Sequence, residues 1–115
     1  MIKPEFDLEE RTARFAEDCR DYFNDLPKTQ SNIEYSGQGI RSSGSQAANY
    51  IEANEALSKR DFYMRIKICK KEAKESRLWL RLSKPISEKE IEKDRLIQEA
   101  IELTRIFSTI VKSNK

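Results

Sequence analysis

Histidine is absent from this 115-residue sequence, and glycine, proline and cysteine are scarce. Without histidine there is no common general base, no Ser-His or Cys-His nucleophile pair and no imidazole metal ligand. Three glycines and three prolines leave little material for long loops. Cys19 and Cys69 stand far apart and form no CxxC pair, so the sequence predicts no zinc site. We therefore expect no enzyme, no cofactor and no metal.

Long apolar stretches are also missing. No run of about 18 apolar residues occurs, so we expect no membrane-spanning helix. The first ten residues are acidic and lack the apolar core of a signal peptide. Both cysteines are then expected to be reduced and buried, as in a cytoplasmic protein.

The composition instead favours helices. Charged and hydrophobic residues each make up 37% of the chain, and aromatic residues only 9%. The net charge of +2 is too small to imply a polyanionic partner by itself. A chain of this length is expected to form one domain over residues 1–115, with a core large enough to need no disulfide.

Four segments show helical periodicity, which predicts an all-α, antiparallel up-down four-helix bundle. The first begins at Asp7, with Glu10 completing a capping box, and ends at Pro27. Its apolar stripe is Leu8, Phe15, Ala16, Cys19, Tyr22, Phe23 and Leu26. The third begins at Ser58 and ends near Leu82, and the fourth runs over residues 87–112. Ser58 with Asp61, and Ser87 with Glu90, are predicted to cap them in the same way. The second segment covers residues 29–57.

The second segment allows two interpretations. The stretch SSGS at residues 42–45 is typical of a loop, whereas the apolar periodicity continues across it. We prefer one long helix, with a bend near Gly44 as an option. Small residues in its predicted buried stripe would let a neighbouring helix approach closely. The stripe is Ile33, Gly37, Ile40, Gly44, Ala47 and Ile51.

The third and fourth segments carry more apolar residues than one core requires. On the third, a stripe from Phe62 to Leu80 is the expected core face, and a second apolar group lies nearly opposite. On the fourth, apolar residues cover an arc of about 220° at 3.6 residues per turn, wider than a surface helix needs. Such a surplus predicts self-association, with Trp79 as an anchor. The predicted oligomer interface is Met64, Ile68, Trp79, Leu82, Leu103, Ile106 and Ile110.

Charge is divided unevenly along the chain. Residues 1–26 contain eight acidic and four basic residues, whereas residues 58–84 contain ten basic and three acidic ones. On the third segment five bases step by three and four and form a ridge about 21 Å long. This basic ridge either contacts nucleic-acid phosphates, pairs with the acids of residues 10–25 in the same or another subunit, or is simply solvated. The ridge is Lys67, Lys70, Lys74, Arg77 and Arg81.

A polar line follows the second segment. It offers no base that could activate a serine, and a slim bundle provides little of the concavity that an active site needs. We interpret it as a polar clamp between helices or subunits. The clamp residues are Arg41, Ser45, Asn49 and Glu52.

Residues 38–53, QGIRSSGSQAANYIEA, resemble the second-helix signature of the four helix bundle protein family. That family includes proteins encoded in intervening sequences of large-subunit ribosomal RNA genes. Its signature reads roughly Gln-x-x-Arg-Ala-Ala-x-Ser-Ile-Pro-Ala-Asn-Ile-Ala-Glu-Gly, and Ala47 and Ala53 replace its proline and glycine. The third segment resembles the family's third helix at Phe62, Ile68, Glu75 and Leu80. The matching residues of the signature are Gln38, Arg41, Ser45, Ala48, Asn49 and Glu52.

The resemblance implies an antiparallel four-helix bundle that assembles as a ring-like homopentamer, and it implies no catalytic residue. A similar fold serves as the accessory protein of diversity-generating retroelements, which binds nucleic acid and a reverse transcriptase. Two functions follow as expectations. The first is a non-catalytic oligomeric scaffold or adaptor for proteins. The alternative is a nucleic-acid-binding accessory protein that uses the basic ridge.

Overall fold

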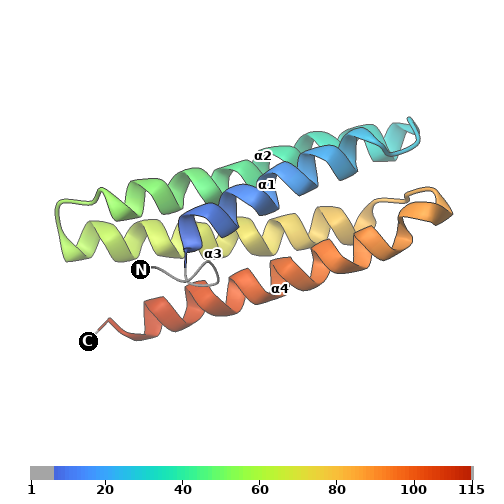
Figure 1. Ribbon diagram of the computed structural model, residues 1–115. Helices are drawn as coiled ribbons and strands as arrows, with labels where there is room; N and C mark the ends of the chain where they lie inside the picture. Colours follow the sequence, from blue (N-terminus) through green and yellow to red (C-terminus); the bar gives the residue numbers. More distant parts are fainter. Residues whose placement is uncertain (1–6, 115) are drawn as a thin grey trace.

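The computed structural model describes residues 7–114, and four long helices account for most of them. They are α1 (Leu8–Asn24), α2 (Gln30–Asn54), α3 (Lys59–Leu82) and α4 (Glu90–Lys112), with a short 3₁₀ turn, η2 (Ser87–Lys89), before α4. Short connections join them at alternating ends, so that consecutive helices run antiparallel (Figure 1). Each helix packs on its neighbours in sequence and α1 also meets α4, which gives the order α1, α2, α3, α4 around the bundle. The predicted all-α, four-helix bundle is confirmed.

Two of the three predicted capping residues, Asp7 and Ser58, cap their helices, and Thr29 caps α2 in the same way although no cap was predicted there. The side chains of Asp7, Thr29 and Ser58 accept hydrogen bonds from backbone N–H groups three residues on, at 3.2, 3.1 and 3.0 Å. The predicted cap at Ser87 is wrong. Ser87 lies in the 3₁₀ turn, and α4 begins after Lys89 without a side-chain cap. A 3₁₀ turn satisfies the first N–H groups by bonds to residues three back, so the serine is not needed there.

The core is one cluster to which all four helices contribute. From α1 and α3 it takes the predicted stripes, including Phe15, Phe23, Ile66 and Leu80. From α4 it takes Leu96, Ala100, Leu103 and Phe107, all fully buried. Burying large apolar side chains of this kind contributes about 1.5–3 kcal/mol each, which makes this cluster the main source of stability.

Helix α2 is continuous through Gly44, as preferred from the sequence, but its predicted buried stripe is wrong. Ile33 and Ile51 are exposed, and a Cβ on Gly37 or Gly44 would meet nothing within 4 Å. Of the predicted stripe only Ala47 is buried, and Ile40 packs partly against the core. The buried face is small and polar instead, and consists of Asn32, Gly39, Ser42, Ser43, Gln46, Ala47 and Ala53.

Hydrogen bonds explain how this polar face can be buried. Ser42 Oγ lies 2.8 Å from Ser76 Oγ of α3. Gln46 Nε2 donates to the carbonyl oxygens of Thr12 and Ser43 at 2.8 and 2.9 Å. Since a buried polar group is tolerated when it is paired, α2 meets its neighbours through short side chains and close backbones rather than through large apolar ones.

Candidate functional site

The basic ridge lies on α3 as predicted. Lys67, Lys74, Arg77 and Arg81 are exposed, and Lys70 is half-buried. Within residues 7–114 none of the five makes an ion pair or a side-chain hydrogen bond. On the other helices, by contrast, Arg11, Arg41 and Arg95 each form an ion pair with a carboxylate of another helix. The ridge is therefore a run of uncompensated positive charge along one side of the molecule.

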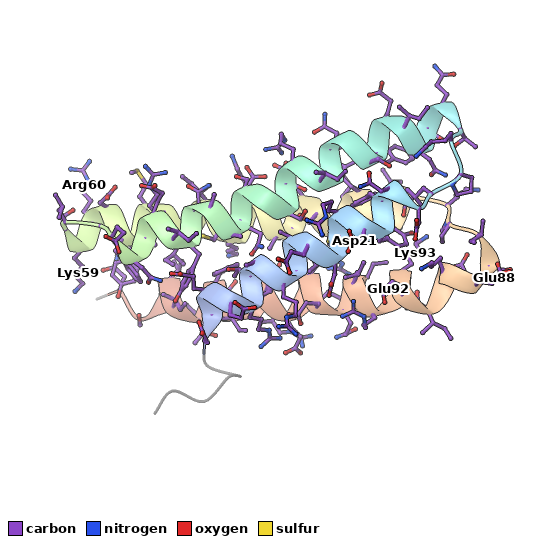
Figure 2. All side chains as sticks on the ribbon, turned by 45° about the horizontal axis from the view of Figure 1, so that its top comes forward. Asp21, Lys59, Arg60, Glu88, Glu92 and Lys93 are labelled. Atoms are coloured by element: carbon purple, nitrogen blue, oxygen red, sulfur yellow. The ribbon has the colours of Figure 1, made fainter. Side chains whose placement is uncertain are left out.

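The acids of α1 do not neutralise the ridge within the chain. Asp18 pairs with Arg95 at 3.0 Å and Asp25 with Lys89 at 3.4 Å, both across the α1–α4 side. Glu10 and Asp21 pair with arginines of α1 itself. Because α1 and α3 occupy opposite corners of the bundle, these acids and the ridge face different directions. Figure 2 shows Asp21 and Glu92 on the α1–α4 side of the molecule.

A second ion-pair cluster joins α1 to α4. Arg11 donates two hydrogen bonds to the Glu99 carboxylate, both at 2.8 Å, and lies 3.8 Å from Glu102. The bond to Glu99 raises the pKa of the Arg11 guanidinium. Hydrogen bonds from Arg95 lower the pKa of Glu92 below its usual range. These ion pairs join α1 to α4, and each charged group in them has an opposite charge beside it. We therefore interpret the cluster as structural.

The structure separates the predicted interface residues into three groups. Met64 and Leu82 are exposed on α3, at 52% and 39% of their surface, and Ile68 is half-buried. Ile106 and Ile110 line a groove of about 420 Å³ between α1 and α4, together with Leu8 and Arg11. Leu103 is fully buried in the core. Its prediction as an interface residue is wrong, because its position on α4 turns directly into the bundle.

Trp79, the predicted anchor of the oligomer interface, packs mainly within its own chain. Its ring stacks on Tyr35 of α2 with the ring centroids 6.1 Å apart, and it packs against the core. Its indole Nε1 is buried and has no hydrogen-bond partner in the described part of the chain. A substitution here would disturb the contact between α2 and α3, so Trp79 is a poor probe of assembly.

The outer face of α2 is an apolar surface that was not predicted from the sequence. Ile33 and Ile51 are 56% and 46% exposed. Between them the helix surface carries small residues at Gly37, Gly44 and Ala48, with the half-buried Ile40 between the glycines and the exposed Arg41 beside them. On α3 the neighbouring exposed side chains include Leu78, at 43%. The periodicity of the isoleucines was a real signal, but it marked an exposed apolar face rather than the core.

The polar clamp lies between α2 and α3. Arg41 Nη2 is 3.2 Å from carboxylate oxygens of both Glu72 and Glu75. Asn49 accepts a hydrogen bond from Arg65 at 3.0 Å and donates to the backbone oxygen of Ser45 at 2.9 Å. Glu52 is exposed and bonds to no other described side chain, so it is outside the clamp. These residues join two helices of one chain.

We also searched the described residues for a metal site, a reactive thiol and a membrane-spanning helix. No three His, Cys, Asp or Glu side chains between residues 7 and 114 are grouped to hold a metal ion. Burial raises the pKa of both thiols, that of Cys69 to about 12, and both cysteines are free. Thiols of this kind are unreactive. No helix in the described range has the length and apolar character needed to cross a bilayer.

Comparison with known proteins supports the fold. No protein-family profile matches the chain, and no curated protein matches it in sequence. The structure is similar to the crystal structure of a protein of unknown function from the S23 ribosomal protein family of Bacteroides thetaiotaomicron. The two chains are 27% identical, with a TM-score of 0.76 over 90% of this chain and 97% of the other. The neighbour shares the four-helix architecture over nearly its whole length, and its name assigns no activity.

Proposed function

We propose that this protein is a non-catalytic, self-assembling bundle that serves as a scaffold or adaptor for other proteins. The observation that supports the proposal is the clustering of exposed apolar side chains. Of the eight large apolar residues that are well exposed in the described range, five lie on α2 and α3. Exposed apolar surface that is gathered on neighbouring helices is typical of a protein contact. These five are Ile33, Ile51, Met64, Leu78 and Leu82.

Light scattering coupled to size exclusion tests the assembly at micromolar concentration. A mass well above the 13.5 kDa of one chain is expected, and five times that mass is the stoichiometry that the family resemblance implies. Met64→Lys with Leu82→Lys should shift the mass toward the monomer. Ile91→Lys is the matched control, because Ile91 is 84% exposed but lies on α4. A monomeric wild-type protein would contradict the proposal.

The proposed function includes a cytoplasmic location, because the two free, buried thiols suit a reducing compartment.

A second candidate function is binding to nucleic acid through the basic ridge, and the unpaired state of its five bases favours it. Phosphate contacts release counterions, so affinity falls steeply with salt, with a slope near −0.9 per neutralised phosphate on duplex DNA. A ring of several chains would repeat the ridge and strengthen its field.

Gel-shift titrations with RNA and DNA at two salt concentrations test this second function. Lys70→Glu with Lys74→Glu should abolish binding and leave the oligomer intact. Lys28→Glu with Lys112→Glu changes the net charge equally at exposed positions away from the ridge, and it should bind nearly as wild type. If the ridge reversal instead disrupts assembly, the ridge pairs with acids of another subunit. If neither property changes, the ridge is a solvated face.

A further inference from the structure

The exposed face of α2 contains two glycines that the chain's own packing does not require. A Cβ on Gly37 or Gly44 would meet nothing within 4 Å, whereas glycine inside a helix is less stable than alanine. Exposed isoleucines, Ile33 and Ile51, lie at the two ends of the same face. The half-buried Ile40 lies between the two glycines, and the exposed Arg41 borders them, so the face is apolar with a notch at each glycine. Its shape suits a partner surface with side chains that enter these notches.

The outer face of α3 carries long exposed side chains. Met64, Leu78 and Leu82 are exposed there, and Lys71 projects between them with a long aliphatic stem. These residues lie on the side of α3 opposite the fully buried Ile66, Ala73 and Leu80. A second copy of this chain therefore carries the projecting surface that the α2 face lacks.

Contacts between α2 and α3 fix which of their residues lie at the same height along the bundle. Tyr35 stacks on Trp79, Asn49 bonds to Arg65, and Asn32 bonds to the backbone of Lys84. By this register the two glycines of the α2 face lie at the same heights as exposed long side chains of α3. The isoleucines at the two ends of the α2 face lie at the same heights as exposed apolar residues of α3. The level pairs are Ile33 with Leu82, Gly37 with Leu78, Gly44 with Lys71, and Ile51 with Met64.

Charges follow the same register. Glu34 is level with Arg81 at one end of the bundle, and Glu55 is level with Arg60 at the other. All four are exposed, and none forms an ion pair with another described residue. The only base of α2, Arg41, is already held by Glu72 and Glu75. The α2 face thus presents acids where the α3 face presents bases.

We propose that the exposed face of α2 docks on the exposed face of α3 of a second copy, with the copies related by rotation about an axis parallel to the helices. Such a rotation preserves height along the bundle, so Gly37 receives Leu78 of the partner subunit and Glu55 approaches Arg60 of the partner subunit. The two helices occupy neighbouring corners, so one copy contacts two others and the contacts close into a ring. This inference rests on the proposed self-assembly and names its surface.

The first experiment fills the two glycine positions on the exposed face of α2. In Gly37→Leu with Gly44→Leu the added Cβ atoms meet nothing within the chain, and leucine favours a helix more than glycine does, so the circular dichroism spectrum should match that of the wild type. In light scattering the variant should be a monomer, because leucine side chains exclude Leu78 and Lys71 of the partner subunit. Ile91→Leu is the control and should keep the wild-type mass.

The second experiment uses cysteine cross-linking and does not depend on that variant. A Gly37→Cys chain is mixed with a tagged Leu78→Cys chain, and the disulfide between them is measured on a non-reducing gel. Native Cys19 and Cys69 are buried and do not compete. A mixture of Ile51→Cys with Leu78→Cys is the control, because those positions differ in height by about 21 Å at 1.5 Å per residue. The matched mixture should cross-link at least tenfold faster than the control.

The outcomes separate this inference from the proposal on which it rests. A folded monomeric double variant together with fast matched cross-linking supports the α2–α3 contact. An oligomer that survives both leucines, or equal cross-linking in the two mixtures, overturns the contact and leaves self-assembly standing. A monomeric wild-type protein overturns both.

Discussion

Gly39 lies directly against the ring of Phe23, where a Cβ built on the glycine would come within 2.2 Å of the ring atoms Cε2 and Cζ. The ring is only 1% exposed and packs in the core at the junction of α1 and α2, so displacing it disturbs that packing. This glycine therefore sets the distance between the two helices.

Replacing this glycine should have the opposite effect to replacing Gly44. Gly39→Ala gains about 1 kcal/mol of helix propensity but overpacks the core, which typically costs about 1–3 kcal/mol. We expect a net loss of about 1 kcal/mol in the free energy of unfolding, measured by urea denaturation. Within one chain the Cβ of Gly44→Ala meets no neighbour, so the monomer should gain up to about 1 kcal/mol. A Gly39→Ala protein as stable as Gly44→Ala would show that the Phe23 ring moves freely.

Asn32 connects two chain turns at one end of the bundle. Its buried amide donates to the carbonyl oxygens of Pro27 and Lys84 at 2.9 and 3.0 Å, and its Oδ1 accepts from the Lys84 N–H at 3.0 Å. Asn32→Asp removes both donors and places a carboxylate beside two carbonyl oxygens. With about 1 kcal/mol for each bond and a desolvation penalty added, we expect a loss of about 2–4 kcal/mol.

The control for this change is Asn54→Asp at the exposed end of α2. Asn54 donates a 3.4 Å hydrogen bond to the exposed Glu9. The repulsion between Glu9 and a new carboxylate there is screened by solvent, so this change should lower the urea midpoint much less than Asn32→Asp. Equal midpoints for the two variants would contradict the role of Asn32.

The buried thiols predict how stability changes at alkaline pH. Burial raises the pKa of Cys69 from about 9 to about 12, so between these values the unfolded thiol loses its proton while the folded one keeps it. Proton release then favours the unfolded chain, and stability should fall as the pH rises from 9 toward 12. Thermal unfolding of Cys69→Ala should show a shallower fall over this range than the wild type. Parallel curves would mean that this thiol is accessible to water in the folded state.

The sequence was sufficient for the parts of the fold that apolar side chains determine. The stripes on α1 and α3 and the four-helix topology were predicted from spacing, because large residues such as Phe15 and Ile66 bury wherever the helix period places them. The start of α4 was misplaced because Ser87 has the residue type of a cap, whereas the chain there forms a 3₁₀ turn.

The α2 face shows why the rest could not be predicted. Its buried residues are small or polar. Ser42 can be buried because it shares a hydrogen bond with Ser76 of α3, and Gln46 because it donates one to the backbone of Thr12 of α1. Those partners are distant in sequence, so local hydropathy favours Ile33 and Ile51 as core residues and gives the wrong side of the helix. The interface predicted from the sequence lies on α3 and α4, whereas the interface that we propose lies on α2 and α3.

The basic ridge predicts a variant that is more stable than the wild type. Lys74 has Lys70 and Lys71 one turn before it and Arg77 one turn after it, and like charges at these spacings destabilise a helix by about 0.2–0.5 kcal/mol per pair. Lys74→Glu turns these repulsions into attractions, so we expect the free energy of unfolding to rise by about 0.5–1 kcal/mol at low salt. Lys74→Gln should gain about half as much, and added salt should narrow all three differences. A destabilised Lys74→Glu protein would mean that an acid of another subunit already neutralises the ridge. A stabilised one means that the chain keeps its positive charge at a cost in stability, which is what a surface that binds a polyanion requires.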